Sequence, residues 1–331
     1  MSPKFKGDSD DWLDEEESSG ISRSSGKKKL KSKSVSLPDD EANAVVVEVF
    51  PNQCAVRMDV AQLEFLCTYR RASLVGKKDD ETRERSPVAV GDRVLVQTLD
   101  HQSGVIEGVC ERKNQLARPA PARATKHVLV SNVDLLVMVA AAQNPDFSPG
   151  LVDRFLVAAA AQKIDVILCI NKIDLNQDAS AWSLYRDIGI LVIEVSAKRE
   201  MGISELRAAI GDRRTVFCGH SGVGKTSLLN VLLNQSKKVA EISESTGKGR
   251  HTTTAAVLLR GSSFIDTPGV REFGLFGMSP EQLVQYFPEF SKLKCKAVSC
   301  LHAGETGCQA TALPRYSSYR RIFESLSLGE N

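Results

Sequence analysis

A glycine-rich segment at residues 219–226 has the composition of a phosphate-binding loop. It fits the pattern G-x-x-x-x-G-K-[ST], follows an apolar run and precedes a stretch with helical character. Glycines let backbone N–H groups and a helix N-terminus surround phosphates, while Lys225 would neutralise phosphate charge and the Thr226 hydroxyl would bind magnesium. The predicted phosphate-binding residues are Gly219, His220, Ser221, Gly222, Val223, Gly224, Lys225, Thr226 and Ser227.

Two short segments upstream of this loop could recognise a base. The first is the tetrapeptide Asn171, Lys172, Ile173 and Asp174. The second is the tripeptide Ser196, Ala197 and Lys198. The Asp174 carboxylate could accept hydrogen bonds from guanine N1–H and N2–H₂, which adenine does not offer, and a backbone N–H of the tripeptide could bind guanine O6. Either segment alone fits a solvated loop, but both follow predicted strands, where open α/β sheets place their ligand-binding loops.

Residues downstream of the loop could bind magnesium and sense a γ-phosphate. Asp266 and Gly269 begin and end a D-T-P-G sequence after a short apolar run, as expected for a metal-side carboxylate and a γ-phosphate-sensing glycine. Residues 247–254 form a basic segment that ends in three threonines. We expect the Thr253 hydroxyl to bind magnesium in the triphosphate state and to order this segment.

The group that would orient an attacking water is not in its usual place. Val270 follows the D-T-P-G sequence, where many GTPases have a glutamine, and an isopropyl group cannot hydrogen-bond to water. His251 lies beside the threonines, and a neutral imidazole can donate to or accept from water near pH 7. His251 is therefore our catalytic candidate, and the alternative is a histidine that contacts RNA or caps the loop.

Three cysteines and a histidine near the C-terminus have the spacing of a metal site. The pattern C-x₄-C-x-H-x₅-C comprises Cys295, Cys300, His302 and Cys308. Three thiolates and one imidazole suit a closed tetrahedral zinc site, which would be structural. The alternative is three unrelated thiols in a surface loop. The other cysteines lie in or beside apolar strands and are expected to be small core residues. They are Cys54, Cys67, Cys110, Cys169 and Cys218.

Alternating strands and helices would position the phosphate and base segments. Strands are predicted at residues 133–141, 165–170, 191–195 and 215–218. Helices are predicted at residues 150–162, 179–188 and 203–210. The strands are apolar on both sides, and this βα alternation predicts a parallel sheet covered by helices.

The region before this sheet has the pattern of a small barrel. Short β-type segments are predicted at residues 44–50, 53–58, 63–69, 92–98 and 104–110. Five strands of this length suggest the oligonucleotide-binding (OB) type of barrel, which often binds nucleic acid but establishes no function by itself. A basic linker is expected at residues 111–127. Residues 1–41 are expected to be a disordered charged tail, because they can bury too little apolar surface to offset their ordering entropy.

Composition excludes several classes of protein. Hydrophobic residues make up 42% and charged residues 25%, as in soluble globular proteins, and a net charge of +2 gives no global argument for a nucleic-acid or membrane partner. The longest apolar run, residues 135–142, is far shorter than the roughly 18 residues of a membrane span, and no secretory signal follows the first lysines. We therefore expect a cytoplasmic protein with reduced cysteines and no membrane partner.

The order of the nucleotide segments differs from that of ordinary GTPases. There the phosphate loop comes first and the base segments last, whereas here Asp174 and Lys198 precede Lys225, which indicates a circular permutation. The chain resembles the bacterial ribosome small-subunit-dependent GTPase A family over nearly everything after the tail, including R-K-N at residues 112–114, G-R-H-T-T-T and the cysteine cluster. It departs at His220, where the family usually has glutamine, and at Thr226, where serine is commoner. Both residues are compatible with phosphate binding.

The resemblance implies a fold and a function. The fold is α/β, with a circularly permuted P-loop GTPase domain, an N-terminal five-stranded OB-type β-barrel and a C-terminal helical zinc-binding domain. The implied boundaries are 1–41 for the tail, 42–115 for the barrel, 116–275 for the GTPase domain and 276–331 for the zinc-binding domain. The resemblance further implies a monomer that binds the small ribosomal subunit and its rRNA late in assembly. Docked there, it would hydrolyse GTP to GDP with magnesium and promote release of itself or another factor.

Two other functions are compatible with these residues. The chain could be an RNA-binding protein whose nucleotide site is only a structural latch, which GTP turnover with and without small subunits would distinguish. It could also be a P-loop ATPase or kinase, against which Asp174 argues. Basic and aromatic side chains near the cysteine cluster could contact RNA or form a solvated helix face. They are Lys292, Lys294, Lys296, Arg315, Tyr316, Tyr319, Arg320 and Arg321.

Overall fold

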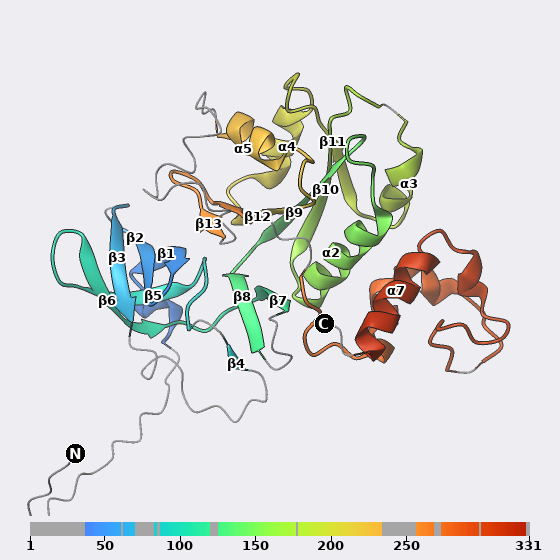
Figure 1. Cartoon of the computed structure of the whole chain (residues 1–331), viewed down its shortest axis with the longest axis horizontal. Coiled ribbons are helices and arrows are strands. Elements are labelled where there is room, and N and C mark those ends of the chain that lie inside the picture. Colours follow the sequence, from blue (N-terminus) through green and yellow to red (C-terminus); the bar gives the residue numbers. More distant parts are fainter. Residues whose placement is uncertain are drawn as a thin grey trace, which may run out of the picture. The chain divides into compact units, whose positions relative to one another are not determined.

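The N-terminal part of the structure is a closed five-stranded barrel (Figure 1). The structure, a computed structural model, describes residues 37–60, 62–69, 83–84, 87–119, 125–176, 178–233, 256–267, 273–297 and 299–328. The barrel strands are β1 (Ala44–Phe50), β2 (Gln53–Met58), β3 (Glu64–Tyr69), β5 (Arg93–Thr98) and β6 (Ser103–Val109). They pair in the order β1-β2-β3-β6-β5, and β5 also pairs with β1. Alternate apolar side chains fill the interior, so the predicted barrel is confirmed.

A β-hairpin occupies much of the stretch that the sequence suggested was a linker. β7 (Gln115–Pro119) pairs antiparallel with β8 (Thr125–Ser131), and the short β4 (Arg83–Glu84) pairs with β8. The expectation of a linker at residues 111–127 is therefore wrong. The many basic residues of this stretch suggested a solvated linker, but Leu116 and Ala117 are only 1% and 4% exposed and pack in the core.

The central domain is a sheet with helices on both faces (Figure 1). Its strands lie in the order β11-β10-β9-β12-β14-β13, all parallel except β13, which runs antiparallel to β14. The strands are β9 (Leu135–Ala141), β10 (Asp165–Asn171), β11 (Leu191–Glu194), β12 (Thr215–Cys218), β13 (Val257–Leu258) and β14 (Phe264–Asp266). The helices are α2 (Pro149–Ala161), α3 (Ser180–Asp187), α4 (Ile203–Ile210) and α5 (Lys225–Leu232). The predicted α/β sheet is thus confirmed.

Two apolar layers join the helices to the sheet. Leu136 and Met138 of β9 share one buried cluster with α2 and α3, whereas Leu135 and Val137 share the other with α4 and α5. This alternation along β9 is why the strand is apolar at every position: both of its faces are covered by helices. The carboxyl ends of β9, β10, β11 and β12 therefore lie at one edge, where their loops can form a common site.

β13 connects this sheet to the barrel. It pairs with β14 on one side and with β1 on the other, where Glu48 lies opposite Val257. Arg57 of β2 is 8% exposed and donates hydrogen bonds to the carbonyl oxygens of Leu258 and Leu259 at 3.5 and 3.3 Å. The barrel is therefore hydrogen-bonded to the strand that follows the predicted threonine segment.

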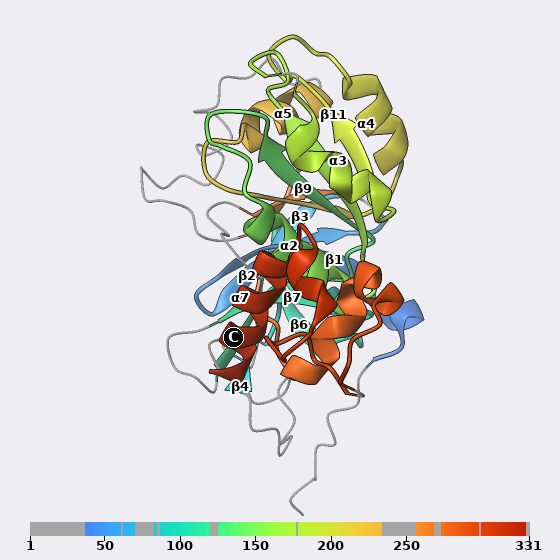
Figure 2. The same cartoon turned by 90° about the vertical axis from the view of Figure 1, so that its right-hand side faces the viewer.

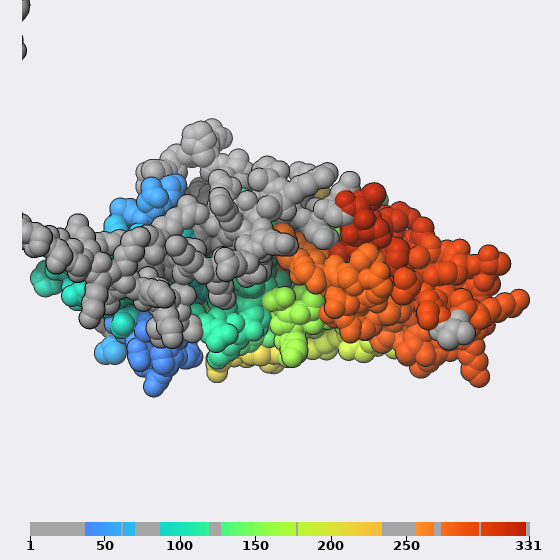
Figure 3. Space-filling view, turned by 90° about the horizontal axis from the view of Figure 1, so that it is seen from below, coloured from blue at the N-terminus to red at the C-terminus, as the bar shows by residue number. Residues whose placement is uncertain are grey.

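The described residues of the C-terminal module, seen in orange and red in Figures 2 and 3, form 3₁₀ turns and one α-helix. Its elements are η2 (Pro280–Tyr286), η3 (Pro288–Lys292), η4 (Gln309–Ala312) and α7 (Tyr316–Ser327). The rings of Phe287, Phe290 and Tyr319 form its core, with centroids 4.9–5.4 Å apart. Within the described part of the chain, no helix is long and apolar enough to cross a membrane.

Candidate nucleotide and metal sites

The glycine-rich loop connects β12 to α5, and its glycines adopt backbone conformations that other residues rarely reach. Gly219, Gly222 and Gly224 have φ values of 140°, 81° and 90°, which residues with a side chain rarely adopt. A Cβ on Gly219 would lie 2.1 Å from the carbonyl oxygen of Val139, so only glycine permits the close approach to β9. Because α5 begins at Lys225, the free N–H groups of its first turn face this loop and favour an anion.

Lys225 and Asp266 are two partly buried charges of opposite sign beside the loop. The Lys225 ammonium donates to the carbonyl oxygens of Gly219 and His220 at 2.7 and 3.1 Å. Burial lowers the pKa of Lys225, and the nearby charge of Asp266 opposes that shift. Burial likewise raises the pKa of Asp266, and Lys225 opposes it. A bound phosphate could replace the two carbonyls as the partner of the ammonium.

The residues around this pair fit a magnesium ion. Oδ1 of Asp266 is buried and has no hydrogen-bond partner among the described residues, an arrangement that is costly unless water or a ligand binds there. The half-buried Thr226 provides a hydroxyl oxygen in the first turn of α5. Thr267 donates to the carbonyl oxygen of Phe217 at 2.8 Å and so holds the end of β14 against β12. Magnesium prefers hard oxygen ligands, which Thr226 and Asp266 offer.

Asn171 attaches the first base segment to both neighbouring loops. It is 2% exposed, its Nδ2 donates to the carbonyl oxygen of Val223 at 2.9 Å, and its Oδ1 accepts from the N–H of Ala197 at 3.0 Å. The Lys172 ammonium donates to the carbonyl oxygen of Gly222 at 2.7 Å. The structure therefore brings the phosphate loop and both predicted base segments together at one sheet edge.

Asp174 is prepared to accept hydrogen bonds. The Ser196 hydroxyl donates to its Oδ1 at 2.6 Å, and this hydrogen bond is the main reason why the pKa of Asp174 lies below its ordinary value. Asp174 is therefore an ionised acceptor at neutral pH. Ile173 packs its side chain against the core instead, and Ser227 is exposed on α5.

The backbone of the tripeptide is already partly used. The N–H of Ser196 donates to Met201 at 3.0 Å, and the N–H of Ala197 donates to Asn171. Among the described residues, only Lys198 of the three then has its N–H available for guanine O6.

Several predicted residues lie outside the described part of the chain. They are His251, Thr253, Gly269 and Val270. Their roles stay predictions from the sequence.

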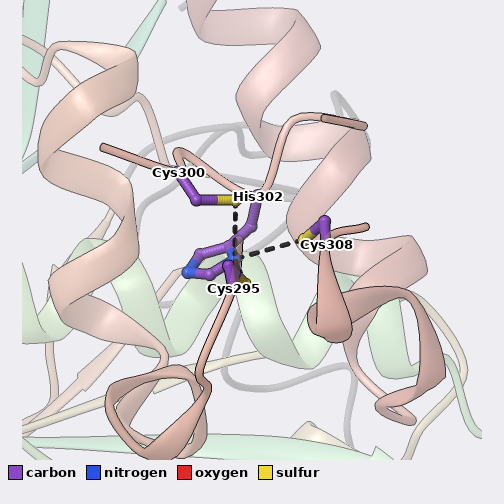
Figure 4. Close-up of side chains that lie close together, drawn as sticks. All are labelled: Cys295, Cys300, His302 and Cys308. Atoms are coloured by element: carbon purple, nitrogen blue, oxygen red, sulfur yellow. Dashed lines mark hydrogen bonds between the residues drawn. The ribbon is translucent and has the colours of Figure 1, made fainter. Parts of the chain in front are cut away.

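The predicted metal ligands converge in the C-terminal module (Figure 4). Nδ1 of His302 lies 3.6 Å from the Sγ atoms of Cys295 and Cys300 and 3.3 Å from that of Cys308. The four ligand atoms all lie within 4.8 Å of one another. With Zn–S near 2.3 Å and Zn–N near 2.0 Å, a tetrahedral ion needs S···N separations of about 3.5 Å. The donor set and its spacing therefore fit zinc.

Neighbouring backbone groups support these ligands. The N–H of Gln309 donates to Cys295 Sγ at 3.5 Å and is the main cause of a lowered pKa of that thiol, which favours the thiolate that zinc binds. Glu305 accepts from the N–H of Leu301 at 2.9 Å. The His302 ring packs edge-on against Phe290 with centroids 4.9 Å apart. The ligands are thus held by packing from the module's own core.

Two residues for which the sequence left open an RNA contact or a place on a solvated helix face are buried instead. Arg315 is 3% exposed and Tyr319 is 0% exposed. Arg315 donates to Asp153 of α2 at 2.8 Å and to both carboxylate oxygens of Glu289 at 3.0 and 3.1 Å, and the Tyr319 hydroxyl donates to the carbonyl oxygen of Leu301. The RNA-contact prediction is wrong for these two residues. Asp153 was the available signal, because a carboxylate inside an apolar helix needs a buried partner.

Known proteins have sequences similar to this one. The sequence model of the RsgA GTPase family matches residues 109–276. A relative from Chlorobaculum tepidum, named small ribosomal subunit biogenesis GTPase RsgA, is 38% identical over 266 residues, or 72% of this chain and 86% of that protein. A protein of the same name from Serratia proteamaculans is 39% identical over 267 residues, which cover 72% of this chain and 76% of the relative.

Solved structures agree with this likeness. YjeQ from Thermotoga maritima superimposes with a TM-score of 0.65 and 30% identity, covering 86% of this chain and 98% of that one. YloQ, described as a circularly permuted GTPase, gives a TM-score of 0.59 and 28% identity over 86% of this chain and 94% of its own. Here too β10 and β11, which carry the base segments, precede β12 and the phosphate loop. The chain therefore belongs to the RsgA GTPase family, with a circularly permuted GTPase domain.

Proposed function

We propose that this GTPase acts late in the biogenesis of the small ribosomal subunit, where it hydrolyses GTP to GDP and so promotes release of itself or another factor. The observation that carries the proposal is the pair of hydrogen bonds of Asn171, which joins the base segments and the phosphate loop into one site. The relatives named small ribosomal subunit biogenesis GTPase RsgA indicate the partner.

The nucleotide would be held by its base and by its phosphates. Asp174 would accept from guanine N1–H and N2–H₂, and the N–H of Lys198 would donate to O6. The loop N–H groups and Lys225 would bind the β- and γ-phosphates, and Gly269 would sense the γ-phosphate. Thr226, Asp266 and Thr253 would hold magnesium, which neutralises charge on the transferred phosphoryl group.

The regions outside the GTPase domain would contact rRNA or support that contact. We place the barrel at residues 42–115, the GTPase domain at 116–275 and the zinc-binding domain at 276–331, after a charged tail at 1–41. Exposed cations of the last domain are available for rRNA phosphates. They are Lys292, Lys294, Lys296 and Arg321. A single structural zinc ion would stabilise the fold of that domain. We propose that the protein is monomeric and cytoplasmic.

GTP turnover measured over a titration with purified small subunits tests this function. We expect slow intrinsic turnover that rises at least about tenfold at saturation, since completing a GTPase site with a partner typically gains far more than that. Subunit binding with no rise in turnover would instead favour an RNA-binding protein with a nucleotide latch. ATP in place of GTP is the control, and equal competition by ATP would contradict the guanine site.

We expect His251→Ala to abolish stimulation by the small subunit while GTP binding is retained. Val270 offers no hydrogen bond to water, so another group must orient it, and general acid–base groups contribute about 10²–10⁴-fold. Turnover at saturating subunits and GTP affinity are the two measurements. His101→Ala is the matched control, because that exposed histidine lies between β5 and β6, outside the nucleotide site, and is expected to leave stimulation intact. Full stimulation of His251→Ala would assign the role to rRNA or another side chain.

A further inference from the structure

The loop that leads into α2 is built into the nucleotide site. The N–H of Ala142 donates to the carbonyl oxygen of Asn171 at 2.8 Å, and the Lys172 ammonium donates to the carbonyl oxygen of Asn144. The same loop and His220 of the phosphate loop line a cavity of about 300 Å³. The loop before α2 is therefore held by residues that also arrange the base and phosphate loops.

A second face of α2 contacts the chain that follows the γ-phosphate segment. Phe155 packs edge-on against Phe273, with ring centroids 5.3 Å apart, and both rings are 1% exposed. Phe273 lies seven residues after Asp266 in the sequence. Two segments that adjoin the predicted nucleotide-binding residues in the chain therefore contact α2 or the loop before it, one ahead of the helix and one at its side.

The third contact of α2 is a buried ion pair with the C-terminal module. Asp153 is 0% exposed, and Arg315 Nε donates to its Oδ1 at 2.8 Å. Nη1 of the same guanidinium donates to both carboxylate oxygens of Glu289, and its Cζ lies 4.4 Å from the ring centroid of Phe287. Because Arg315 is buried, separating its guanidinium from either Asp153 or Glu289 would leave an unpaired charge away from water. The position of the module relative to α2 is therefore tightly constrained.

From Arg315 the packing continues to a predicted zinc ligand. Phe287 contacts Phe290 with centroids 5.4 Å apart, and Phe290 contacts His302 at 4.9 Å. A shift of the module relative to α2 would therefore act on the Asp153 pair and on the aromatic core together, since densely packed interiors do not deform continuously.

We propose that Arg315 is a positioning residue that couples the C-terminal module to the nucleotide site through Asp153 and α2. Nucleotide binding fixes the start of α2, which holds Asp153 where Arg315 can bind it and so stabilises the docked module. By linkage, a partner that holds the module docked raises the affinity for the same nucleotide state. This coupling rests on the proposed GTPase function, but it does not depend on which partner binds the module.

Two isosteric substitutions separate this coupling from the stability of the module. Asp153→Asn removes the charge on α2 but leaves the Arg315–Glu289 pair inside the module. Glu289→Gln removes the charge inside the module but leaves the pair to α2. Hydrogen exchange of α7 is measured on the full-length chain without nucleotide, with GDP and with a non-hydrolysable GTP analogue. Zinc content is determined for every preparation.

We expect the GTP analogue to slow exchange of α7 about fivefold or more relative to GDP in the wild-type chain, the lower end of usual couplings between sites. Asp153→Asn should abolish this difference, while zinc content and the protection of α5 by nucleotide stay at wild-type levels. In Glu289→Gln, α7 should exchange faster than in the wild-type chain in every nucleotide state. The difference between the GTP analogue and GDP should remain.

Equal exchange of wild-type α7 in all nucleotide states overturns the proposal, and so does a difference that survives in Asp153→Asn. If Asp153→Asn does not fold, Arg315→Lys gives the same comparison, because an ammonium cannot bind both carboxylates as the guanidinium does. Exchange is measured without ribosomal subunits, so failure of the coupling is distinguishable from failure of subunit-stimulated turnover.

Discussion

Asp174→Asn is expected to weaken GTP binding about 100-fold or more and to make xanthosine triphosphate the better ligand. The asparagine amide presents a donor where guanine N2–H₂ needs an acceptor, whereas the carbonyl at the same position of xanthine can accept from it. The Ser196 hydroxyl, which donates to Asp174 at 2.6 Å, can also donate to the amide oxygen. The loop should therefore keep its shape, and fluorescent-nucleotide titrations with both purines measure the change.

Asp178→Asn is the matched control for this exchange. Asp178 lies four residues after Asp174, is exposed, and accepts from the N–H of Ser180 at the start of α3 at 2.9 Å. Its substitution should leave both affinities unchanged. Because the pKa of Asp174 lies below its ordinary value, GTP affinity should also persist as the pH falls toward the ordinary aspartate range. Unchanged GTP affinity in Asp174→Asn would place the base pocket elsewhere.

Much of the fold follows from local sequence patterns. β9 is apolar at every position because helices cover both faces of the sheet, and the barrel strands β3, β5 and β6 alternate because only one of their faces is buried. The phosphate loop is equally local, since the close approach of Gly219 to Val139 requires a residue without Cβ. The metal ligands lie within one short segment, so their spacing alone predicts that they converge.

The sequence does not predict which residues far apart in the chain contact one another. Arg315 and Asp153 are 162 residues apart, and nothing near Arg315 in the chain distinguishes it from exposed cations such as Arg321. Asn171 was predicted to recognise the base, yet its side chain bridges the phosphate loop and the second base segment. This bridge forms because β9 alone separates β10 from β12 in the sheet, an arrangement that the local sequence does not reveal. The sequence did not predict the hairpin of β7 and β8, because its many basic residues indicated a linker and its apolar positions are few.

Cys300→Ser is expected to remove zinc and unfold the C-terminal module while GTP binding is retained. A hydroxyl is a much poorer zinc ligand than a thiolate, and in small zinc modules the binding free energy of about 10–16 kcal/mol is folding free energy. The nucleotide loops depend on a separate apolar layer between the sheet, α4 and α5. Metal analysis should fall from about one zinc per chain to near zero.

Cys110→Ser tests whether this effect belongs to the metal. Cys110 is buried outside the metal cluster, and its Sγ donates to the carbonyl oxygen of Pro38 at 3.4 Å, a bond that a serine hydroxyl can make. It should keep zinc and its resistance to proteolysis. In Cys300→Ser, cleavage should begin within residues 276–331, and small-subunit binding should weaken more than GTP binding. A wild-type chain that lacks zinc after purification without chelators would contradict the metal assignment. A zinc-free Cys300→Ser chain whose module resists proteolysis would show that the aromatic core and the Arg315 pair hold the module without the ion.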